Sequence, residues 1–470
     1  MDSFEGFLHG FNIFMLGYVL VLQLIFTVLA IAGWRAIEDY VRRRPMRDYR
    51  SVAESEMSMP VSILVPAYNE EPSIVASLRS LLKSQFIEFE VVVINDGSKD
   101  GTLEALKQAF QLEGFPEVYW RRINAQPIRT IYHSRTHANL RVIDKVNGGK
   151  ADALNVGINA SRYPLFCAID ADSILQRDAL RRVIEPFLDD PTAIASGGTV
   201  RIANGCTVSG GNLEKVELPR NLLAMLQIVE YLRAFLFGRM GWATVDAVLI
   251  ISGAFGVFRK DAVVEAGGYK ANTIGEDMEL IVRLHRVLRT RGERYKIHFV
   301  PDPICWTEAP EDLSILKNQR IRWQRGLCES LHQNRDLLKA KNMGGTPGFL
   351  AYPFFMVFEC YGPLIEVAGY VFMAFMFAIG QVSGAAFLAF LALAFSLGFL
   401  LSVSALMLEE LSFHLYPRFS QMGALICTAI VENLGYRQLV TVWRLIGLTR
   451  WLRGAKSSWG AMKRKGSWQK

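Results

Sequence analysis

The sequence predicts an α/β fold, in which a Rossmann-like domain with a buried parallel sheet is joined to membrane-associated helices. Between residues 58 and 342, short β-branched runs alternate with helical stretches, which is typical of β-α-β units. On both sides of this region lie apolar stretches, and the mean hydropathy of the 470-residue chain is +0.19. A positive value over a whole chain of this length indicates membrane segments.

The first apolar stretch covers residues 11–33 and holds no charged residue. As a helix it is long enough to cross a hydrocarbon core of about 30 Å, so we expect a transmembrane helix over residues 1–34. A cleaved signal peptide is the alternative, but the first ten residues contain Asp2 and Glu5 and no Lys or Arg. Residues 35–57 form a basic linker with Arg35, Arg42, Arg43, Arg44, Arg47 and Arg50, which predicts that the following domain is cytoplasmic.

A second apolar block, residues 349–408, predicts transmembrane helices within 343–410, with a turn at 380–384. Its two acids, Glu359 and Glu366, either face a polar cavity or mark helix ends. Residues 411–470 combine an interrupted apolar stretch with a basic tail, and predict an amphipathic or re-entrant helix at the cytoplasmic surface. Membrane topology thus accounts for the net charge of +7, and no nucleic acid is expected as a partner.

Polar residues follow three predicted strands, 61–68, 89–96 and 165–170, with helices expected over 72–85 and 151–160. In open α/β sheets, ligands bind at the carboxyl ends of the strands. The residues at these ends are Tyr68, Asn69 and Glu70, then Asn95 and Asp96, then Asp170 and Asp172. So many acids close together require compensation by a cation or a ligand, which predicts a binding site.

Asp170 and Asp172 stand two residues apart, so at the end of an extended strand both point to one side. Carboxylates of this kind suit Mg²⁺ or Mn²⁺; the alternative is a strand-end turn in which Asp172 caps a helix. Lys150 follows two glycines at a predicted helix start, where a phosphate binds well, although a solvated lysine explains it too. The six scattered cysteines form no C-x-x-C pair, so neither a zinc site nor a disulfide framework is indicated.

Six motifs in order carry a resemblance to a known family: VPAYNEE, VVVINDGSKDGT, GGKADALN, AIDADS, GED (275–277) and QRIRWQRG (319–326). The sequence resembles the membrane-embedded family-2 glycosyltransferases, which include cellulose, chitin, hyaluronan and poly-N-acetylglucosamine synthases. The resemblance runs from about residue 61 to residue 326 and implies a GT-A catalytic domain, here over residues 58–342, that uses a UDP-sugar with Mg²⁺ or Mn²⁺.

The resemblance also implies a role for each matching residue. Donor binding falls to Pro66, Tyr68, Asn69, Glu70, Asp96, Lys150, Asp170, Gln319 and Arg322, and the metal to Asp170 and Asp172. Asp277 and the adjacent Glu276 are the expected catalytic residues, with Asp277 as the general base. Trp323 and the loop residues Ser252, Gly253, Ala254 and Phe255 are expected to bind the acceptor, and residues 217–239 to form an interface helix.

These expectations define an inverting β-glycosyltransferase in the plasma membrane that polymerises a UDP-activated hexose, glucose or N-acetylglucosamine, and moves the polysaccharide through its helices. Glu359, Tyr361, Glu366, Glu432 and Asn433 are then candidate polymer contacts, or else polar residues at helix ends. Transfer of one sugar to a lipid-phosphate carrier is an alternative, and an inactive membrane scaffold is another. Because few spans are expected, a homo-oligomer or accessory export subunits stay open as partners beside the UDP-sugar, the growing polysaccharide and the lipid bilayer.

Overall fold

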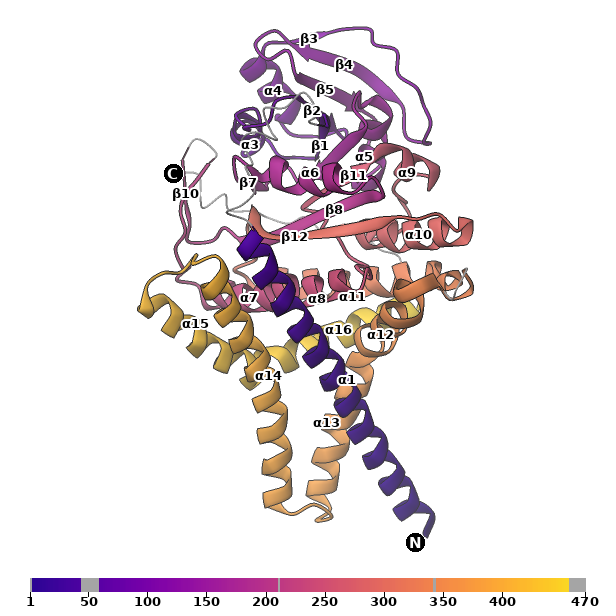
Figure 1. Ribbon diagram of the computed structural model, residues 1–470, viewed down its shortest axis with the longest axis vertical. Coiled ribbons are helices and arrows are strands. Elements are labelled where there is room, and N and C mark those ends of the chain that lie inside the picture. Colours follow the sequence, from indigo (N-terminus) through magenta and orange to yellow (C-terminus); the bar gives the residue numbers. More distant parts are fainter. Residues whose placement is uncertain (1, 44–58, 210–211, 341–343, 456–470) are drawn as a thin grey trace.

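The computed structural model describes residues 2–43, 59–209, 212–340 and 344–455. Most of the basic linker predicted over 35–57, including Arg44, Arg47 and Arg50, therefore lies outside the described residues, as does the basic tail after residue 455. Figure 1 shows a body built on a sheet, a stalk of helices that projects from it, and a layer of helices between the two.

The body is built on a ten-stranded mixed sheet with the order β3-β4-β5-β2-β1-β6-β11-β8-β12-β7. Its strands are β1 (Val61–Ala67), β2 (Phe89–Asn95), β3 (Leu112–Gly114), β4 (Ile128–Ser134), β5 (Leu140–Lys145), β6 (Leu165–Ile169), β7 (Ile174–Leu175), β8 (Ala193–Ile202), β11 (Phe255–Arg259) and β12 (Lys296–Thr307). A separate two-stranded sheet pairs β9 (Thr207–Ser209) with β10 (Asn212–Lys215).

The centre of the sheet is parallel, as the β-branched runs predict. Val61 of β1 aligns with Phe89 of β2 on one side and with Leu165 of β6 on the other. The carboxyl ends of these strands therefore lie at one edge. Beyond β6 the sheet is mixed, because β11 runs antiparallel to both β6 and β8. The predicted α/β fold is confirmed, although its sheet is not purely parallel.

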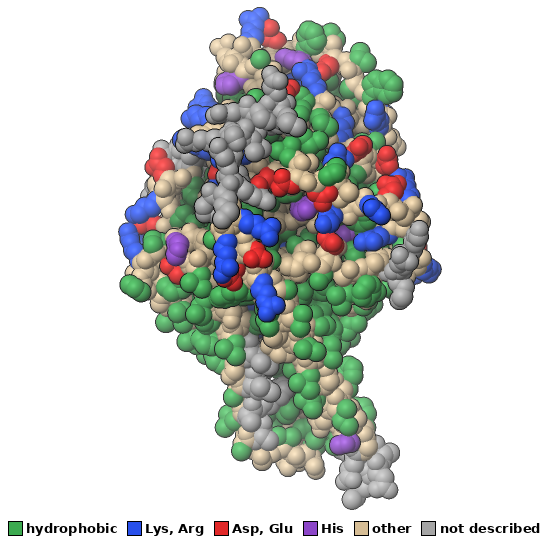
Figure 2. All heavy atoms as spheres, in the orientation of Figure 1, with side chains coloured by type: hydrophobic (Ala, Val, Ile, Leu, Met, Phe, Trp, Pro, Cys, Tyr) green, Lys and Arg blue, Asp and Glu red, His purple; other side chains and the backbone are tan. Residues whose placement is uncertain are grey.

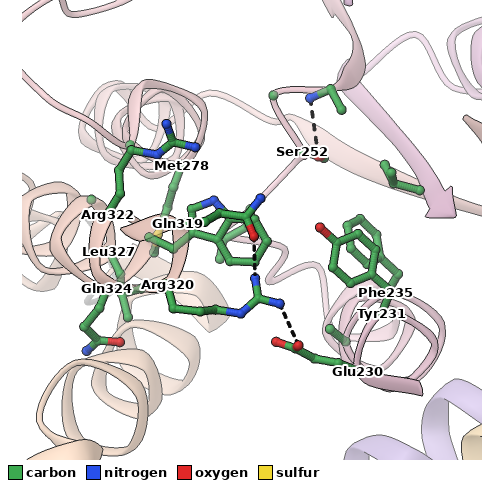
Figure 3. A pocket seen from close by; sticks show the side chains of 18 of the residues that line it. Glu230, Tyr231, Phe235, Ser252, Met278, Gln319, Arg320, Arg322, Gln324 and Leu327 are labelled. Carbon is green, nitrogen blue, oxygen red and sulfur yellow. Dashed lines mark hydrogen bonds and ion pairs between the residues drawn. The ribbon is translucent and has the colours of Figure 1, made fainter. Parts of the chain in front are cut away.

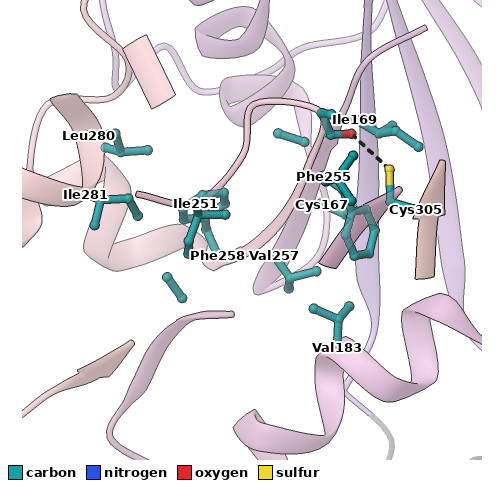
Figure 4. Packing of buried hydrophobic residues seen from close by; sticks show 14 of the residues in the cluster. Cys167, Ile169, Val183, Ile251, Phe255, Val257, Phe258, Leu280, Ile281 and Cys305 are labelled. Carbon is teal, nitrogen blue, oxygen red and sulfur yellow. Dashed lines mark hydrogen bonds between the residues drawn. The ribbon is translucent and has the colours of Figure 1, made fainter. Parts of the chain in front are cut away.

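The core lies on both faces of the central strands. Figure 4 shows Cys167 and Ile169 of β6 beside Phe255 and Val257 of β11, with Val183 of a covering helix against them. These side chains are almost completely buried. Burial of this kind stabilises the body by about 1.5–3 kcal/mol for each large apolar side chain and holds the strand ends in place.

Helices cover the sheet and form the layer toward the stalk (Figure 1). They are α3 (Ile74–Leu81), α4 (Thr102–Phe110), α5 (Lys150–Ala160), α6 (Ala179–Asp189), α7 (Leu222–Tyr231), η2 (Leu232–Arg239), α8 (Met240–Thr244), α9 (Lys260–Glu265), α10 (Glu276–Arg291), α11 (Leu313–Gln333), η3 (Arg335–Lys339), η5 (Pro347–Ala351), α12 (Tyr352–Phe354) and η6 (Phe355–Cys360). Asn221 caps α7 by accepting hydrogen bonds from the N–H groups of Leu223 and Ala224.

The stalk consists of α1 (Asp2–Arg43), α13 (Gly362–Ala378) and α14 (Gly384–Ser412). α1 continues to Arg43, so the helix expected to end at residue 34 extends into the predicted linker. Among the described residues, Gly6–Arg43 is long and apolar enough to cross a membrane. The helical segments Pro347–Cys360 and Gly362–Ala378 meet at a bend of 45°. Taken together as one span, they are also long and apolar enough to cross a membrane. Figure 2 shows hydrophobic side chains gathered over the stalk and the adjoining part of the body.

Three further segments lie between body and stalk: α15 (Phe419–Val431), η7 (Glu432–Tyr436) and α16 (Arg437–Leu452). The helical path breaks at Leu434 and Gly435, which have non-helical backbone angles. α16 packs along α11, and α15 packs against α7. The amphipathic or re-entrant placement of this region in a membrane stays a prediction.

Two polar contacts join the stalk to the sheet. Tyr40 near the end of α1 donates a hydrogen bond to Asp302 of β12. Arg201 of β8 forms a buried ion pair with Glu409 of α14. Because β8 and β12 are neighbouring strands, the first and last helices of the stalk are fixed to the same part of the sheet.

Candidate active site

The ends of β1 and β2 are connected by hydrogen bonds between the loops that follow them. The Asn69 side chain accepts from the N–H of Lys99 at 2.8 Å, and the N–H of Asn69 donates to Ser98 Oγ at 3.1 Å. The N–H of Glu70 donates to Thr102 Oγ1 at 2.9 Å. Asn69 has a positive φ of 57°, which an asparagine adopts more readily than most residues. These bonds hold in place the end of β1 and the loop after it, where Pro66, Tyr68, Asn69 and Glu70 lie.

Asp96 is buried at the end of β2 and is surrounded by hydrogen-bond donors. It pairs with Lys145 and accepts from the N–H groups of Gly148 and Gly149 at 2.9 and 2.7 Å. Burial raises the pKa of Asp96, and the bonds to Lys145 and to the two glycines oppose that shift. Asp96 thus ties the strand end to the glycine turn before α5 while one side of the residue faces the cavity described below.

Lys150 is the first residue of α5 and lies at the centre of an ion cluster. Its Nζ is 2.5 Å from Asp170 Oδ1 and 3.7 Å from Glu276 Oε1, and it donates to the carbonyl of Gly253 at 3.2 Å. Burial alone lowers the pKa of this amine, but the carboxylates of Asp170 and Glu276 outweigh burial and raise it. Lys150 is therefore a fixed positive charge at a helix start, where an anion binds well.

Asp170 and Asp172 lie in a turn after β6. The N–H of Ser173 donates to the carbonyl of Asp170 at 3.0 Å, so strand alternation does not govern these two side chains, contrary to our expectation. Both nevertheless line the same cavity. Among the described residues, no group of three or more His, Cys, Asp or Glu side chains could hold a metal ion. Two carboxylates suit a cation whose other ligands are phosphate oxygens and water, so the donor set fits Mg²⁺ or Mn²⁺ bound together with a diphosphate.

Glu276 and Asp277 open α10, where the helix dipole favours negative charge. Asp277 Oδ2 accepts from the N–H of Gly253 at 2.9 Å, and its Oδ1 accepts from the N–H of Met278 at 2.8 Å. Burial raises the pKa of Glu276 to about 7, with Lys150 opposing and Asp277 adding to the shift. Asp277 is the more accessible of the two carboxylates, so it is better placed to receive a proton from a ligand.

α11 carries Gln319, Arg322 and Trp323, from the QRIRWQRG motif, to the same cavity. Trp323 is 44% exposed and lines the cavity, so it is not a core residue. The guanidinium of Arg320 lies over its ring at 4.3 Å from the centroid. Figure 3 shows Arg320 between Gln319 and Glu230, with bonds of 3.1 and 2.7 Å to them. A tryptophan face supported in this way is suited to stacking against a sugar ring.

Two glycines bring α11 into backbone contact with the loop before α10. A Cβ at Gly326 would meet the Cα and N of Gly275 at 2.9 Å, and a Cβ at Gly275 would meet the backbone of Gly326 at the same distance. Ser330 and Glu329 add hydrogen bonds from α11 to the Gly275 carbonyl and the Ile274 N–H, at 3.2 and 3.1 Å. The loop that positions Asp277 thus rests directly on the helix that carries Trp323.

A single cavity of about 1550 Å³ joins these groups. It is lined by all but one of the predicted site residues, namely Pro66, Tyr68, Asn69, Glu70, Asp96, Lys150, Asp170, Asp172, Ser252, Gly253, Ala254, Glu276, Asp277, Gln319, Arg322 and Trp323. Asp96, Asp172 and Asp277 therefore face the same cavity. This arrangement is necessary if all three are to bind one small ligand.

The exception is Phe255, for which an acceptor contact was expected. Phe255 begins β11, its ring is completely buried among core residues, and it is not part of the cavity wall. The expectation for Phe255 is wrong, because the turn between Ser252 and Phe255, closed by a 3.1 Å backbone hydrogen bond, directs only its first residues to the cavity.

The cavity continues from the sheet toward the stalk. There it is lined by Tyr18 of α1, Glu366 of α13, Gly398 of α14 and the broken segment around Asn433. Of the candidate polymer contacts, Glu359, Glu366, Glu432 and Asn433 line it, whereas Tyr361 is not among the lining residues. Each of the four is bonded to another lining residue: Glu359 to Arg444 (2.7 Å), Glu432 to Arg233 (2.6 Å), Glu366 to Thr441 (3.0 Å) and Asn433 to Arg437 (3.0 Å).

Sequence reasoning missed several polar residues of this wall, and three of them, Glu230, Arg320 and Arg239, lie near the predicted site residues or their elements. Glu230 and Arg320 pair across 90 positions of the chain, which no local pattern reveals. Arg239 ends η2 and lines the cavity, and burial lowers its pKa to about 10, with Asp277 opposing. Two of these residues, Glu230 and Arg239, lie in the segment 217–239 that was expected to form an interface helix. The position of that segment was the signal that could have identified them.

Known proteins agree with this architecture. The chain is 28% identical over 326 residues to a poly-beta-1,6-N-acetyl-D-glucosamine synthase of Staphylococcus epidermidis, covering 69% of this chain and 67% of that enzyme. It is 32% identical over 274 residues to the enzyme of that name from Staphylococcus aureus, covering 58% of this chain but only 55% of the relative.

The fold also resembles a solved mannosyltransferase from Pyrobaculum calidifontis, in complex with GDP-mannose and Mn²⁺. The TM-score is 0.52 at 20% identity, and the match covers 88% of this chain and 99% of the other. At this identity the likeness concerns the fold, which places the body among GT-A domains.

Family descriptions match most of the chain between β1 and α14. "Glycosyl transferase family 2" matches residues 62–263, and "Glycosyl transferase family group 2" matches residues 165–407. The second match alone covers more than half of the 470 residues and extends from the sheet into the stalk. The chain belongs to the family-2 glycosyltransferases.

Proposed function

We propose that the protein is an inverting β-glycosyltransferase that polymerises N-acetylglucosamine from UDP-N-acetylglucosamine and passes the polysaccharide along its cavity. One observation carries the proposal: the cavity that holds the acids at the strand ends is the cavity that continues between the stalk helices. The staphylococcal relatives, named for poly-N-acetylglucosamine synthesis, support N-acetylglucosamine over glucose as the donor sugar.

The donor would occupy the sheet side of the cavity. Asp96, Asn69 and Glu70 line the cavity and would contact the nucleoside. Lys150 and Arg322 would supply positive charge for the diphosphate. Asp170 and Asp172 would hold a Mg²⁺ or Mn²⁺ ion, which supplies further charge to neutralise the departing diphosphate. Preorganised charges of this kind contribute most when water is excluded, as in a partly enclosed cavity.

Asp277 would act as the general base. The N–H of Gly253 holds one of its oxygens, so the carboxylate is oriented before the acceptor arrives. The acceptor hydroxyl attacks the anomeric carbon while its proton moves to Asp277. The bond from that carbon to the diphosphate breaks, and UDP leaves with the electron pair. One such displacement converts the α-linkage of the donor into a β-linkage. Base catalysis accelerates the reaction by about 10²–10⁴-fold.

The acceptor would lie on the stalk side, with its last sugar on Trp323. The ring of Tyr231 is 6.4 Å from Trp323, so two aromatic rings border this position. Further along the cavity, paired groups such as Arg444–Glu359 and Arg233–Glu432 offer polar atoms to a neutral polymer. Polar groups inside a bundle of apolar helices are tolerated where they border a hydrated path.

The stalk would lie in the plasma membrane of a bacterium, with the body in the cytoplasm, where UDP-sugars are made. The outward side chains of α1 are large and apolar, including Phe7, Ile13, Leu16, Leu20 and Leu24, each more than half exposed. Lipid tails would cover these apolar side chains, whose exposure to water is unfavourable. Whether the chain acts alone or with further copies or export subunits is tested by the size of the active particle.

The decisive experiment uses the full chain in detergent or nanodiscs, with Mg²⁺ or Mn²⁺ and a set of UDP-sugars. We expect UDP release with UDP-N-acetylglucosamine and a product of many sugar units on a sizing gel. Asp277→Asn is the matched control, because it keeps the shape but cannot accept a proton. A product extracted into organic solvent and carrying one sugar would instead support transfer to a lipid-phosphate carrier. Absence of turnover with every UDP-sugar would reject the proposal.

A further inference from the structure

Arg239 is a cation of the cavity wall that forms no salt bridge with any described residue, although the charge of Asp277 acts on it at longer range. It ends η2, a segment packed against α1, α14, β8 and β12, at the junction of body and stalk. Its Nη1 is buried and makes no hydrogen bond with any residue that the structure describes. The side chain nevertheless borders the cavity, so its remaining donors can reach a ligand there.

Three other arginines of the cavity wall each form a salt bridge with a carboxylate of the protein. Arg320 pairs with Glu230, Arg233 with Glu432, and Arg444 with Glu359. Arg239 instead has aromatic rings around it: its guanidinium carbon lies 3.7 Å from the centroid of Phe235 and 6.0 Å from that of Phe299. The rings hold the side chain in place but accept no conventional hydrogen bond.

A buried charge without hydrogen-bonding partners is costly, and the cost falls when a ligand contributes an oxygen acceptor. Arg239 stays protonated at neutral pH, because burial lowers its pKa only to about 10. A guanidinium binds carbonyl and anionic oxygens and repels an ammonium group. Its position thus favours a ligand that presents an oxygen acceptor and no positive charge.

Aromatic contacts place Arg239 on the side of the cavity where Trp323 lies. The guanidinium of Arg239 lies over the ring of Phe235, whose centroid is 5.3 Å from that of Tyr231, and the centroid of Tyr231 is 6.4 Å from that of Trp323. Arg239 also comes from η2, on the stalk side of the cavity, and not from a strand end. The group it meets is therefore the sugar that presents its hydroxyl to Asp277.

We propose that Arg239 selects the acceptor by donating hydrogen bonds to the acetamido carbonyl of the acceptor-end sugar. This inference rests on the proposed function and extends it by naming the acceptor class: an N-acetylated hexosamine end is bound, and a de-N-acetylated end is rejected. The amide oxygen offers lone pairs to the guanidinium. The protonated amine of a glucosamine end offers none and places a second positive charge beside Arg239.

The experiment measures transfer from saturating UDP-N-acetylglucosamine to three short oligosaccharides that differ only at C2 of the acceptor-end sugar. That carbon carries an acetamide, a hydroxyl or an amine, and mass spectrometry counts the sugars added. For the unaltered protein we expect kcat/KM to rank acetamide first, hydroxyl second and amine last. An amine that is used as well as the acetamide would overturn the proposal.

Arg239→Gln and Arg239→Lys test the residue. Loss of a charge-assisted hydrogen bond should raise KM for the acetamide acceptor about 10- to 100-fold in Arg239→Gln. Its preference for acetamide over amine should fall by at least the same factor, because the repulsion is removed too. Arg239→Lys keeps the charge and one donor, so it should still reject the amine while binding the acetamide less well. The matched control is Arg259→Gln.

 Arg259 ends β11, donates to the carbonyl of Ala193 at 3.0 Å and does not line the cavity, so its replacement should leave the KM values for all three acceptors unchanged.

Two further measurements separate this role from others. The Kd for UDP and the KM for UDP-N-acetylglucosamine should change less than about 2-fold in both Arg239 variants, and a large loss of UDP affinity would assign Arg239 to the donor instead. An equal loss with all three acceptors would indicate a structural role and overturn the proposal. If the unaltered protein transfers no sugar to any acceptor, the proposed function fails. If the protein is active and Arg239→Gln keeps the unaltered preference for acetamide over amine, this inference alone is refuted.

Discussion

Gly326→Ala should impair catalysis by moving the loop that holds Asp277. The new Cβ would meet the Cα and N of Gly275 at 2.9 Å, and both are backbone atoms that cannot rotate away. Ordinary carbon contacts lie at about 3.5–4.0 Å, so α11 and this loop must separate by roughly 0.6–1 Å. Errors of about 1 Å in a reacting geometry cost about 10²-fold, and we expect turnover to fall about 10- to 100-fold.

The assay measures UDP release at saturating donor, with UDP affinity and thermal unfolding measured in parallel. Overpacking should also lower the free energy of unfolding, by about 1–3 kcal/mol. Gly423→Ala is the matched control, because Gly423 lies within α15 and a Cβ there would meet nothing within 4 Å. If Gly326→Ala keeps more than half of the wild-type turnover, direct contact between the two backbones does not position the base.

Three other predictions concern the base, a buried histidine and the junction with the stalk. Asp277→Asn should lower turnover about 10²–10⁴-fold while UDP still binds, and near-normal turnover would reject Asp277 as the base. Burial lowers the pKa of His285 from its ordinary 6.5 to about 4, so the unfolded chain binds the extra proton first as pH falls. The native state should therefore lose up to about 3 kcal/mol between pH 6.5 and 4 relative to His285→Gln, and parallel denaturation curves for the two proteins would contradict this. Glu409→Gln leaves Arg201 buried without its counter-charge and should cost about 3–5 kcal/mol, measured by thermal unfolding against Glu410→Gln; equal stability of the two variants would contradict it.

The central strands could be predicted from sequence because their chemistry is local. Residues 61–67, 89–95 and 165–169 form near-continuous apolar runs, and such runs have few other stable places than the middle of a parallel sheet. The acids that follow them reach one cavity because parallel strands end at one edge. The outer strands were less clear: β11 pairs antiparallel between β6 and β8, and nothing in its five residues specifies a direction.

The parts of the site that the sequence did not reveal depend on long-range packing. Glu230 and Arg320, or Gly275 and Gly326, become partners only when α7, α10 and α11 are packed together. Phe255 failed as a site residue for a related reason, because the loop before β11 turns sharply and buries it. Motifs thus predicted which residues face the ligand, but not which contacts hold them there.

The two links between stalk and sheet, Tyr40 with Asp302 and Arg201 with Glu409, have a mechanical consequence. They attach the first and last stalk helices to adjacent strands, so the body has little freedom to rock against the bilayer. During repeated sugar addition the frame would stay still. In the polymerisation proposed above, displacement would then be borne by the carbohydrate chain itself, which would advance past stationary walls one residue per reaction cycle.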